Sequence, residues 1–223
     1  MEHRTVILCP LAIERKAAAR VAEDRALVVQ CGPGAVAAAS AARLALRRVA
    51  DRIIVFGVAG GLLECEPCPL VTRVVDGEGH DWATPNVTAE AGVTLLGVDA
   101  PIWSVADKRA AHHRTGATLV DCESHAVARE CAQVGAWWRV VRGVSDPADR
   151  ALPCQTSRWV TADGNTRAWR AAVDLVARPS LIPRVRELAG STERALRAAS
   201  ERLDAVLNDR AFTSFELVRG VRT

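Results

Sequence analysis

The chain carries little net charge and almost no lysine, which limits the partners that it is expected to bind. Its 29 Lys and Arg nearly balance its 26 Asp and Glu, which leaves a formal net charge of +3. Only Lys16 and Lys108 are lysines, and no block of like charge forms a tail. This composition gives no argument for nucleic acid as a partner.

Long hydrophobic runs are also missing. The longest run, IIVFGVAGGLL at 53–63, is too short to span a bilayer, and charged residues follow Met1 too soon for a signal peptide. The seven cysteines are an odd number and lie mostly in apolar stretches such as VILCP and VVQCG. We therefore expect reduced thiols in a cytoplasmic protein without a transmembrane segment.

What the sequence does contain is an alternation of short β-branched runs with helical patterns. Near-continuous apolar strands separated by helices predict an α/β fold whose mostly parallel sheet is covered on both faces. Residues 1–210 are expected to form a single domain, and 211–223 a C-terminal tail without clear pattern. Strands are predicted at 5–9, 26–31, 52–58 (ended by the glycines of AGG), 117–121 and 137–144, and helices at 11–22, 123–135, 165–177 and 184–207.

Several chemically capable residues follow the predicted strands. In open α/β sheets, ligands bind beyond the carboxyl ends of the strands, so these residues are expected to converge on one site. The stretches concerned are 10–14, 31–34, 59–61, 145–146 and the end of the strand at 117–121.

Two glycine clusters stand where a strand ends. In CGPGAVAAA, Gly32 and Gly34 would let backbone amides approach an anion at a helix N-terminus. The spacing fits neither a Walker loop nor the dinucleotide fingerprint, and a tight strand–helix turn explains it equally well. The same two interpretations apply to Gly60 in GVAGGL.

Two carboxylates outside these clusters have a functional and a structural interpretation. Glu14 lies one turn into a helix, where a carboxylate often serves only the helix dipole. Asp146 follows Ser145 in VRGVSDPAD, and Asp before Pro is common turn chemistry. In a closed pocket, the same aspartate could instead give a proton to a ring nitrogen.

The stretch VDCESHAVA brings together Asp121, Cys122, Glu123 and His125. Glu123 and His125 are two residues apart, so they do not share a helix face. This spacing disfavours both a metal pair and a cysteine–histidine dyad. A carboxylate that accepts hydrogen bonds from a polyol fits Glu123 better, and Asp121 and His125 are expected to be structural.

Two other groups are interpreted as structural. CEPC at 65–68 has dithiol spacing but contains proline, and no second pair stands at zinc spacing. Lys108, His112 and His113 are expected on the solvated surface of one helix. No metal site is predicted.

Taken together, these motifs resemble the nucleoside phosphorylase and nucleosidase superfamily. Within it, the chain is most similar to the hopanoid-associated phosphorylases, on the stretches DKRAAHHRTGA, DPADRALP and AWRAAVDLVARPSLIPRVREL. The resemblance implies a three-layer α/β/α sandwich with a central mixed, partly barrel-like sheet, and it implies a homo-oligomer. The motifs that carry it are PLAIE (10–14), CGPGAVAAASAA (31–42), FGVAGGL (56–62), TGATLVDCESHAVA (115–128) and VRGVSDPAD (141–149).

The resemblance also implies roles for the catalytic and ribose-binding residues. Asp146 would protonate the leaving purine and Ser145 would orient it. Glu123 would hold the ribose hydroxyls, with Cys122 beside the sugar where relatives usually have methionine. Glu14 would lie on the nucleophile side.

The remaining implied positions are those around the nucleophile and the base. Gly32, Gly34 and Gly60 would border the phosphate or water, and Pro101 and Ile102 would line the base pocket. The resemblance implies no organic cofactor.

The implied reaction is phosphorolysis of a 5′-modified adenosine such as adenosylhopane, with inorganic phosphate as co-substrate and adenine as product. A hydrolytic nucleosidase of the methylthioadenosine/S-adenosylhomocysteine or futalosine type is the alternative, and a non-catalytic nucleoside-binding protein is a third. The candidates for a phosphate-binding arginine, by chain position only, are Arg15, Arg20 and Arg142.

A lipid-linked substrate would require a wide apolar groove or access from a membrane surface, with the protein peripheral to it. Trp159, Trp169, Leu181 and Ile182 could border such a channel. The alternative is that this C-terminal segment forms only a covering layer of helices.

Overall fold

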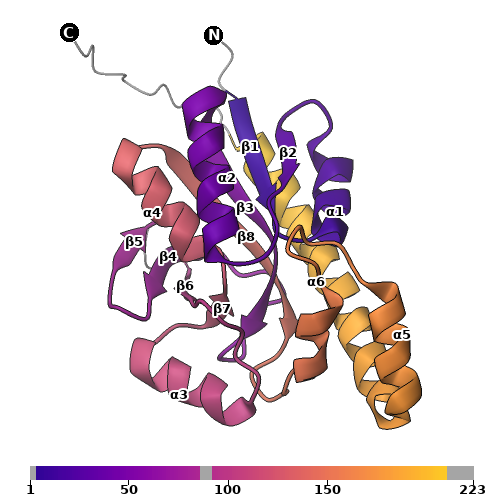
Figure 1. Ribbon diagram of the computed structural model, residues 1–223. Coiled ribbons are helices and arrows are strands. Elements are labelled where there is room, and N and C mark those ends of the chain that lie inside the picture. Colours follow the sequence, from indigo (N-terminus) through magenta and orange to yellow (C-terminus); the bar gives the residue numbers. More distant parts are fainter. Residues whose placement is uncertain (1–3, 86–91, 210–223) are drawn as a thin grey trace, which may run out of the picture.

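A computed structural model describes residues 4–85 and 92–209 (Figure 1). The predicted tail at 211–223 lies outside the described residues. The elements are β1 (Arg4–Cys9), α1 (Ala12–Ala22), β2 (Leu27–Gln30), α2 (Ala35–Arg48), β3 (Ala50–Gly61), β4 (Val71–Asp76), β5 (Asp81–Ala83), β6 (Val93–Gly97), α3 (Val105–Thr115), β7 (Leu119–Asp121), α4 (Ser124–Val134), β8 (Trp137–Asp146), η2 (Cys154–Trp159), α5 (Ala168–Ala177), η3 (Pro179–Leu181) and α6 (Ile182–Asn208).

The strands of the described residues form one mixed sheet of eight, which confirms the predicted α/β class. The order along the sheet is β2-β1-β3-β7-β6-β4-β5, and β8 pairs with β3 outside this path. β3 is parallel to β1 and β8 but antiparallel to β7. The long strand β3 is therefore the element from which the sheet branches.

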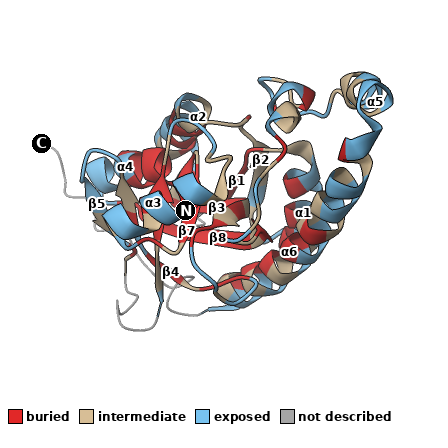
Figure 2. Ribbon diagram, turned by 90° about the horizontal axis from the view of Figure 1, so that it is seen from below, coloured by how far each residue is buried: buried red, intermediate tan, exposed pale blue. Residues whose placement is uncertain are grey.

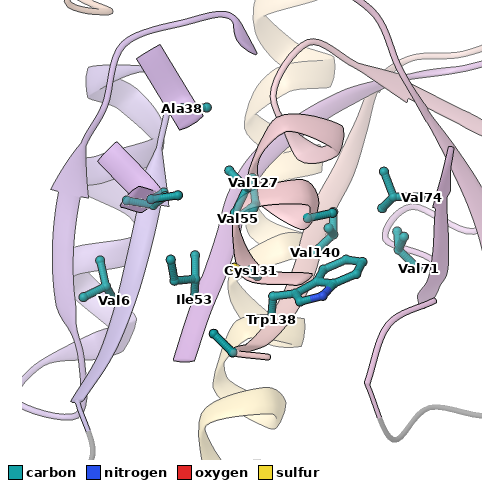
Figure 3. Packing of buried hydrophobic residues seen from close by; sticks show 14 of the residues in the cluster. Val6, Ala38, Ile53, Val55, Val71, Val74, Val127, Cys131, Trp138 and Val140 are labelled. Atoms are coloured by element: carbon teal, nitrogen blue, oxygen red, sulfur yellow. The ribbon is translucent and has the colours of Figure 1, made fainter. Parts of the chain in front are cut away.

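Helices cover both faces of the sheet, so the predicted three-layer arrangement is confirmed. On one face, α2 and α4 contact each other and enclose a core with the sheet. Figure 3 shows this core, in which Val127 and Cys131 of α4 lie against Val55, Val140 and Trp138.

The opposite face is covered by α1 and α6 (Figure 1). Small residues of α1, Ala18 and Ala22, pack with Leu196, Ala199 and Leu203 of α6. The apolar side of α6 therefore belongs to the core. For this helix, the alternative of a covering layer fits better than the border of a lipid channel.

Helix α5 differs from the other helices because none of its residues is buried. Figure 2 shows it at the edge of the molecule, apart from the sheet. The four residues predicted for a lipid channel are divided accordingly. Trp159 and Leu181 are buried, whereas Trp169 on α5 is 64% exposed, so the four do not share one environment.

The predicted end of the third strand is wrong. The sequence AGG was expected to terminate it, but β3 continues through Gly61. Gly60 pairs with Val120 of β7 on one side and with Asp146 of β8 on the other. A Cβ at Gly60 would come 3.0 Å from an Asp146 oxygen and 3.2 Å from Val120, so glycine allows the three strands to meet there.

The packing of α6 leads to a prediction about stability. Leu203 is completely buried between α6 and the sheet, so Leu203→Ala should lower the free energy of unfolding by about 2–5 kcal/mol. Val176→Ala on α5, where Val176 is 82% exposed, is the matched control and should change it by less than about 0.5 kcal/mol. Urea unfolding of both variants measures the difference, and equal small losses would contradict the assigned packing of α6.

Candidate active site

The predicted site residues come together where β3, β7 and β8 end. The pairing of Gly60 with both Val120 and Asp146 puts the end of β8 next to the strand that leads into Glu123. Two groups of buried charged side chains lie in this region. One is built around Arg142 and the other around Asp146.

Arg142 is fully buried and binds two carboxylates. Its Nε donates to Asp121 Oδ2 at 2.8 Å, and its Nη2 donates to Glu123 Oε2 at 2.9 Å. The Asp121 carboxylate is also bound by the Ser124 hydroxyl at 2.5 Å and by the Ser124 N–H. Burial opposes the charge of Arg142, but the surrounding carboxylates outweigh it and raise the pKa of this guanidinium.

Glu14 is the third carboxylate of this group. Its Oε2 accepts the N–H of Leu11 at 2.7 Å, and its Oε1 accepts the N–H of Val58 at 2.9 Å and lies 3.8 Å from Arg142 Nη1. Burial raises the pKa of Glu14 to about 7 despite the opposing effect of Arg142. A carboxylate with this pKa can accept a proton near neutral pH, as a general base does.

A donor next to Glu14 is left without a hydrogen bond. Among the described residues, Arg142 Nη1 is buried with no hydrogen-bond partner. Buried polar groups are normally satisfied by protein or by water. Nη1 and Glu14 Oε1 are thus a donor and an acceptor that lie 3.8 Å apart.

Gly57 makes this approach possible, and sequence reasoning did not single it out. A Cβ at this position would collide with Glu14 Oε1 and Arg142 Nη1. Gly57 stands in FGVAGGL, one residue before Val58, whose N–H binds Glu14. The signal in the sequence was a glycine inside an otherwise apolar strand, which often marks close approach of another group.

Glu123 also reaches the predicted glycine turn. Its Oε1 accepts the N–H of Gly34 at 2.8 Å, immediately before the first residue of α2. Gly34 has φ +93°, and a Cβ there would meet no atom within 4 Å. By contrast, a Cβ at Gly32 would collide with the Ala162 carbonyl. Gly34 therefore faces open space beside Glu123, whereas Gly32 is needed for close packing.

The second group contains Asp146, Ser145 and Lys108. Asp146 is buried, with Oδ1 2.8 Å from the Ser145 hydroxyl and Oδ2 2.6 Å from Lys108 Nζ. Burial raises the pKa of Asp146, while Lys108 and Ser145 act in the opposite direction.

The prediction that Lys108 lies on a solvated helix surface is wrong. Lys108 is 0% exposed, and its Nζ also donates to the carbonyls of Pro147 at 2.9 Å and Arg150 at 3.0 Å. The helix turns Lys108 and Ala111 inward together, while His113 stays exposed and His112 is half-buried. Spacing within the helix did not reveal this, because the burial depends on the distant segment after β8.

The other predicted positions have less defined surroundings. Cys122 is half-buried, and burial with the neighbouring Glu123 and Asp121 raises the pKa of its thiol to about 12, which disfavours a thiolate. Ile102 packs against the small cluster that includes Val120, while Pro101 is exposed.

The three arginine candidates for phosphate binding are not equivalent. Arg15 and Arg20 are exposed on α1, and Arg15 donates to Gln30. Arg142 is committed to carboxylates, as described above. Its chain position suggested an anion site, but the residues around it are themselves anionic.

One group of side chains has the composition of a metal site. In the residues described, Asp76, Glu78 and His80 have ligand atoms within 4.8 Å of one another. Asp76 ends β4 and is half-buried, Glu78 and His80 are exposed in the turn before β5, and His80 already pairs with Asp76 at 2.8 Å. At CEPC, Cys65 and Cys68 are both free thiols.

Solved structures with the same fold define the class of architecture. A Helicobacter pylori MTAN mutant with 5′-methylthioadenosine in its active site aligns with a TM-score of 0.64 at 14% identity, over 92% of this chain and 98% of that chain. Futalosine hydrolase of Helicobacter pylori gives 0.64 at 13% identity, over 92% and 97%. The 5′-methylthioadenosine/S-adenosylhomocysteine nucleosidase of Neisseria meningitidis, complexed with methylthio-immucillin-A, gives 0.63 at 16%, over 92% and 100%. The chain therefore has the nucleoside phosphorylase and nucleosidase fold.

A family model narrows the resemblance. Residues 70–177, somewhat less than half of the chain, match the model described as Phosphorylase superfamily. This match supports the predicted superfamily resemblance and includes Lys108, Glu123, Arg142 and Asp146. A search of curated proteins found no match. Within the described ranges, no helix is long and apolar enough to cross a membrane.

The pKa of Glu14 leads to a prediction about the pH dependence of stability. Its folded value of about 7 exceeds the ordinary value of 4.5, so the native protein binds this proton more tightly than the unfolded chain does. The stability contributed by Glu14 should therefore fall as the pH rises from about 4.5 to about 7, by about 1.4 kcal/mol for each unit of pKa difference.

Urea unfolding at pH 5 and pH 8 measures this effect. Glu14→Gln should remove this part of the decline, whereas the matched control Glu64→Gln, at an exposed position, should keep the wild-type slope. Parallel curves for wild type and Glu14→Gln would contradict the raised pKa.

Proposed function

We propose that this chain is a member of the phosphorylase superfamily that cleaves the N-glycosidic bond of a purine nucleoside with water as the attacking group. The charge around Arg142 is the observation that carries this proposal. One guanidinium is surrounded by the carboxylates of Glu14, Asp121 and Glu123. The group has a net charge of −2 when all three carboxylates are ionised, and of −1 when Glu14, whose pKa is about 7, holds its proton.

This charge favours water over phosphate. A phosphate dianion beside Arg142 would have to approach three carboxylates. Arg142 itself is already bound to two of them, Asp121 and Glu123. A neutral water meets no such repulsion, and it would find the free Nη1 donor of Arg142 and the acceptor oxygens of Glu14. The names of the similar solved structures, nucleosidases and a hydrolase, agree with this choice.

The same negative charge supports bond cleavage. As the glycosidic bond breaks, positive charge develops on the ribose, and fixed anionic groups stabilise it. Glu123 is held by Arg142 and the Gly34 N–H, which orients its carboxylate to accept hydrogen bonds from ribose hydroxyls. Cys122 lies beside it as a neutral thiol.

Proton transfers complete the reaction. Glu14, with its pKa of about 7, accepts a proton from the attacking water. Asp146, oriented by Ser145, gives a proton to a nitrogen of the leaving purine. The absence of a side chain at Gly60 leaves room for the Asp146 carboxyl beside β3. Ile102 and the exposed Pro101 border the space proposed for the base.

A 5′-modified adenosine remains the proposed substrate class. We extend this class to a lipid-linked nucleoside, whose apolar 5′ substituent would contact exposed apolar side chains. The exposed apolar residues of α5 support this extension. Association into a homo-oligomer and a cytoplasmic location, peripheral to a membrane if the substrate is lipid-linked, belong to the same proposal.

Adenine release tests the proposed reaction. Wild type should release adenine from 5′-methylthioadenosine or another 5′-substituted adenosine at the same rate with and without phosphate, as measured by chromatography. A strict phosphate requirement with sugar 1-phosphate as product would make the chain a phosphorylase. Absence of adenine release on a broad nucleoside panel would favour a binding protein.

Two substitutions test the assigned proton transfers. Asp146→Asn and Glu14→Gln should each lower kcat by roughly 100-fold or more, since each removes a positioned acid or base, while nucleoside binding measured by calorimetry persists. Glu64→Gln is the matched control and should retain full activity. Unchanged turnover in Asp146→Asn would exclude this residue as the acid.

A further inference from the structure

The most unusual feature of the site is the buried ammonium group of Lys108. Besides binding Asp146 Oδ2 at 2.6 Å, its Nζ lies 3.3 Å from the Asp146 carbonyl, 2.9 Å from that of Pro147 and 3.0 Å from that of Arg150. An ammonium group has three hydrogens to donate. Each of them therefore has an acceptor, so the amine is both fully satisfied and tightly fixed.

We propose that Lys108 is a positioning residue for Asp146, which fixes the carboxyl and neutralises the carboxylate left when its proton passes to the leaving base. This inference rests on the proposed function for its chemical step. Lys108 belongs to α3, while Asp146 ends β8, 38 residues further along the chain. The contact thus joins α3 to the strand that carries the acid.

The geometry fixes both oxygens of the acid. Ser145 lies at Oδ1 and Lys108 at Oδ2, and the second contact also ties down the chain from Asp146 to Arg150. A further bond, from the Leu152 N–H to the Trp103 carbonyl at 3.0 Å, joins the same two segments just before α3. These two contacts therefore connect the segment after Asp146 both to α3 and to the loop that contains Pro101 and Ile102.

The proton balance is simple. The electron pair of the glycosidic bond passes to the purine, whose nitrogen takes the proton from Asp146. Asp146 becomes a carboxylate beside the Lys108 ammonium, which keeps all its protons. After the base leaves, Asp146 regains a proton from solvent. Because Lys108 stabilises the ionised form, it makes Asp146 a stronger acid and favours the transfer.

Three charged or titratable groups on the same two segments have partners of their own, and Arg109 and Asp149 are exposed. On α3, Asp107 is exposed and binds Ser104, and His112 Nδ1 binds the Ala117 carbonyl. After β8, Arg150 pairs with Glu187 of α6 at 2.8 Å. Among the described residues, Lys108 is the charged side chain that directly contacts Asp146.

The pH profile of adenine release tests the proposal. Activity that needs protonated Asp146 falls on the alkaline side, as pH rises through its pKa. Lys108→Met removes the charge that lowers this pKa, so the alkaline limb of the kcat profile should move up by roughly one to three pH units. The value of kcat below that limb should fall by roughly 100-fold because the acid loses its alignment.

Two variants serve as controls. Lys108→Arg keeps the charge, so its alkaline limb should stay close to that of wild type even if kcat is lower. Lys16→Met replaces the other lysine, which is exposed on α1, and should leave both kcat and the profile unchanged. A loss of kcat in Lys108→Met without movement of the limb would show a merely structural lysine and overturn the proposal.

A spectroscopic measurement on the unaltered protein does not depend on activity. With two lysines in the chain, ¹⁵N-labelled side-chain amines give two NMR signals. The Lys108 ammonium protons should exchange slowly with solvent and its signal should shift as Asp146 titrates, a step that Asp146→Asn abolishes. Rapid exchange, or the same titration in Asp146→Asn, would overturn the proposal. If wild type releases no base but the NMR step is present, the proposed function fails while the coupling of Lys108 to Asp146 stands.

Discussion

The buried contact between Arg142 and its carboxylates is the interaction on which the site depends. A fully buried guanidinium is tolerated only when it is paired and hydrogen-bonded. Asp121 and Glu123 supply these bonds from the end of β7 and the turn before α4. Glu14 adds its charge from α1 on the other face of the sheet. One side chain of β8 thereby connects both helical layers to the centre of the sheet.

This arrangement constrains the surrounding backbone. Gly57 must lack a side chain because Glu14 and Arg142 occupy the space beside it. Gly34 offers its N–H to Glu123 at the start of α2. Gly57 therefore leaves room for the side chains of the carboxylate group, and Gly34 binds one of these carboxylates through its backbone N–H.

Much of this arrangement could be predicted from the sequence. Apolar strands alternating with helices predicted the layers. The rule that ligands bind at carboxyl ends of strands predicted a common region for Glu14, Glu123 and Asp146, in which the glutamates share Arg142 and Asp146 lies in a second group. The strand and helix patterns are local features of the sequence, and the position of the strand ends follows from the topology that these patterns predict. The fold of the C-terminal region was less accessible, because α6 is amphipathic and its partners on β8 and α1 are distant in sequence.

Lys108, Arg142 and Gly57 show where sequence reasoning ends. Lys108 stands among polar residues in a helix that has almost no apolar stripe, so only its contact with the segment after β8 explains its burial. Arg142 is a candidate for phosphate binding by chain position only. The carboxylates that bind it lie 19 and 21 positions away, so the sequence around Arg142 does not reveal the negative charge of its surroundings. A glycine inside a strand predicts close approach, but it does not identify the approaching group.

The charged side chains of the site form two groups, one around Arg142 and one around Asp146. Around Arg142 the carboxylates outnumber the cation, which suits the cationic ribosyl state and the neutral nucleophile of the proposed reaction. Around Asp146, a single lysine balances a single acid. This asymmetry is the physical basis for choosing water as the attacking group.

The most direct test of that choice is to run the reaction in H₂¹⁸O with phosphate present and to weigh the sugar product by mass spectrometry. The account predicts a free sugar that carries one ¹⁸O atom from solvent. An unlabelled sugar 1-phosphate would contradict it, because phosphate would then have attacked in spite of the carboxylates around Arg142.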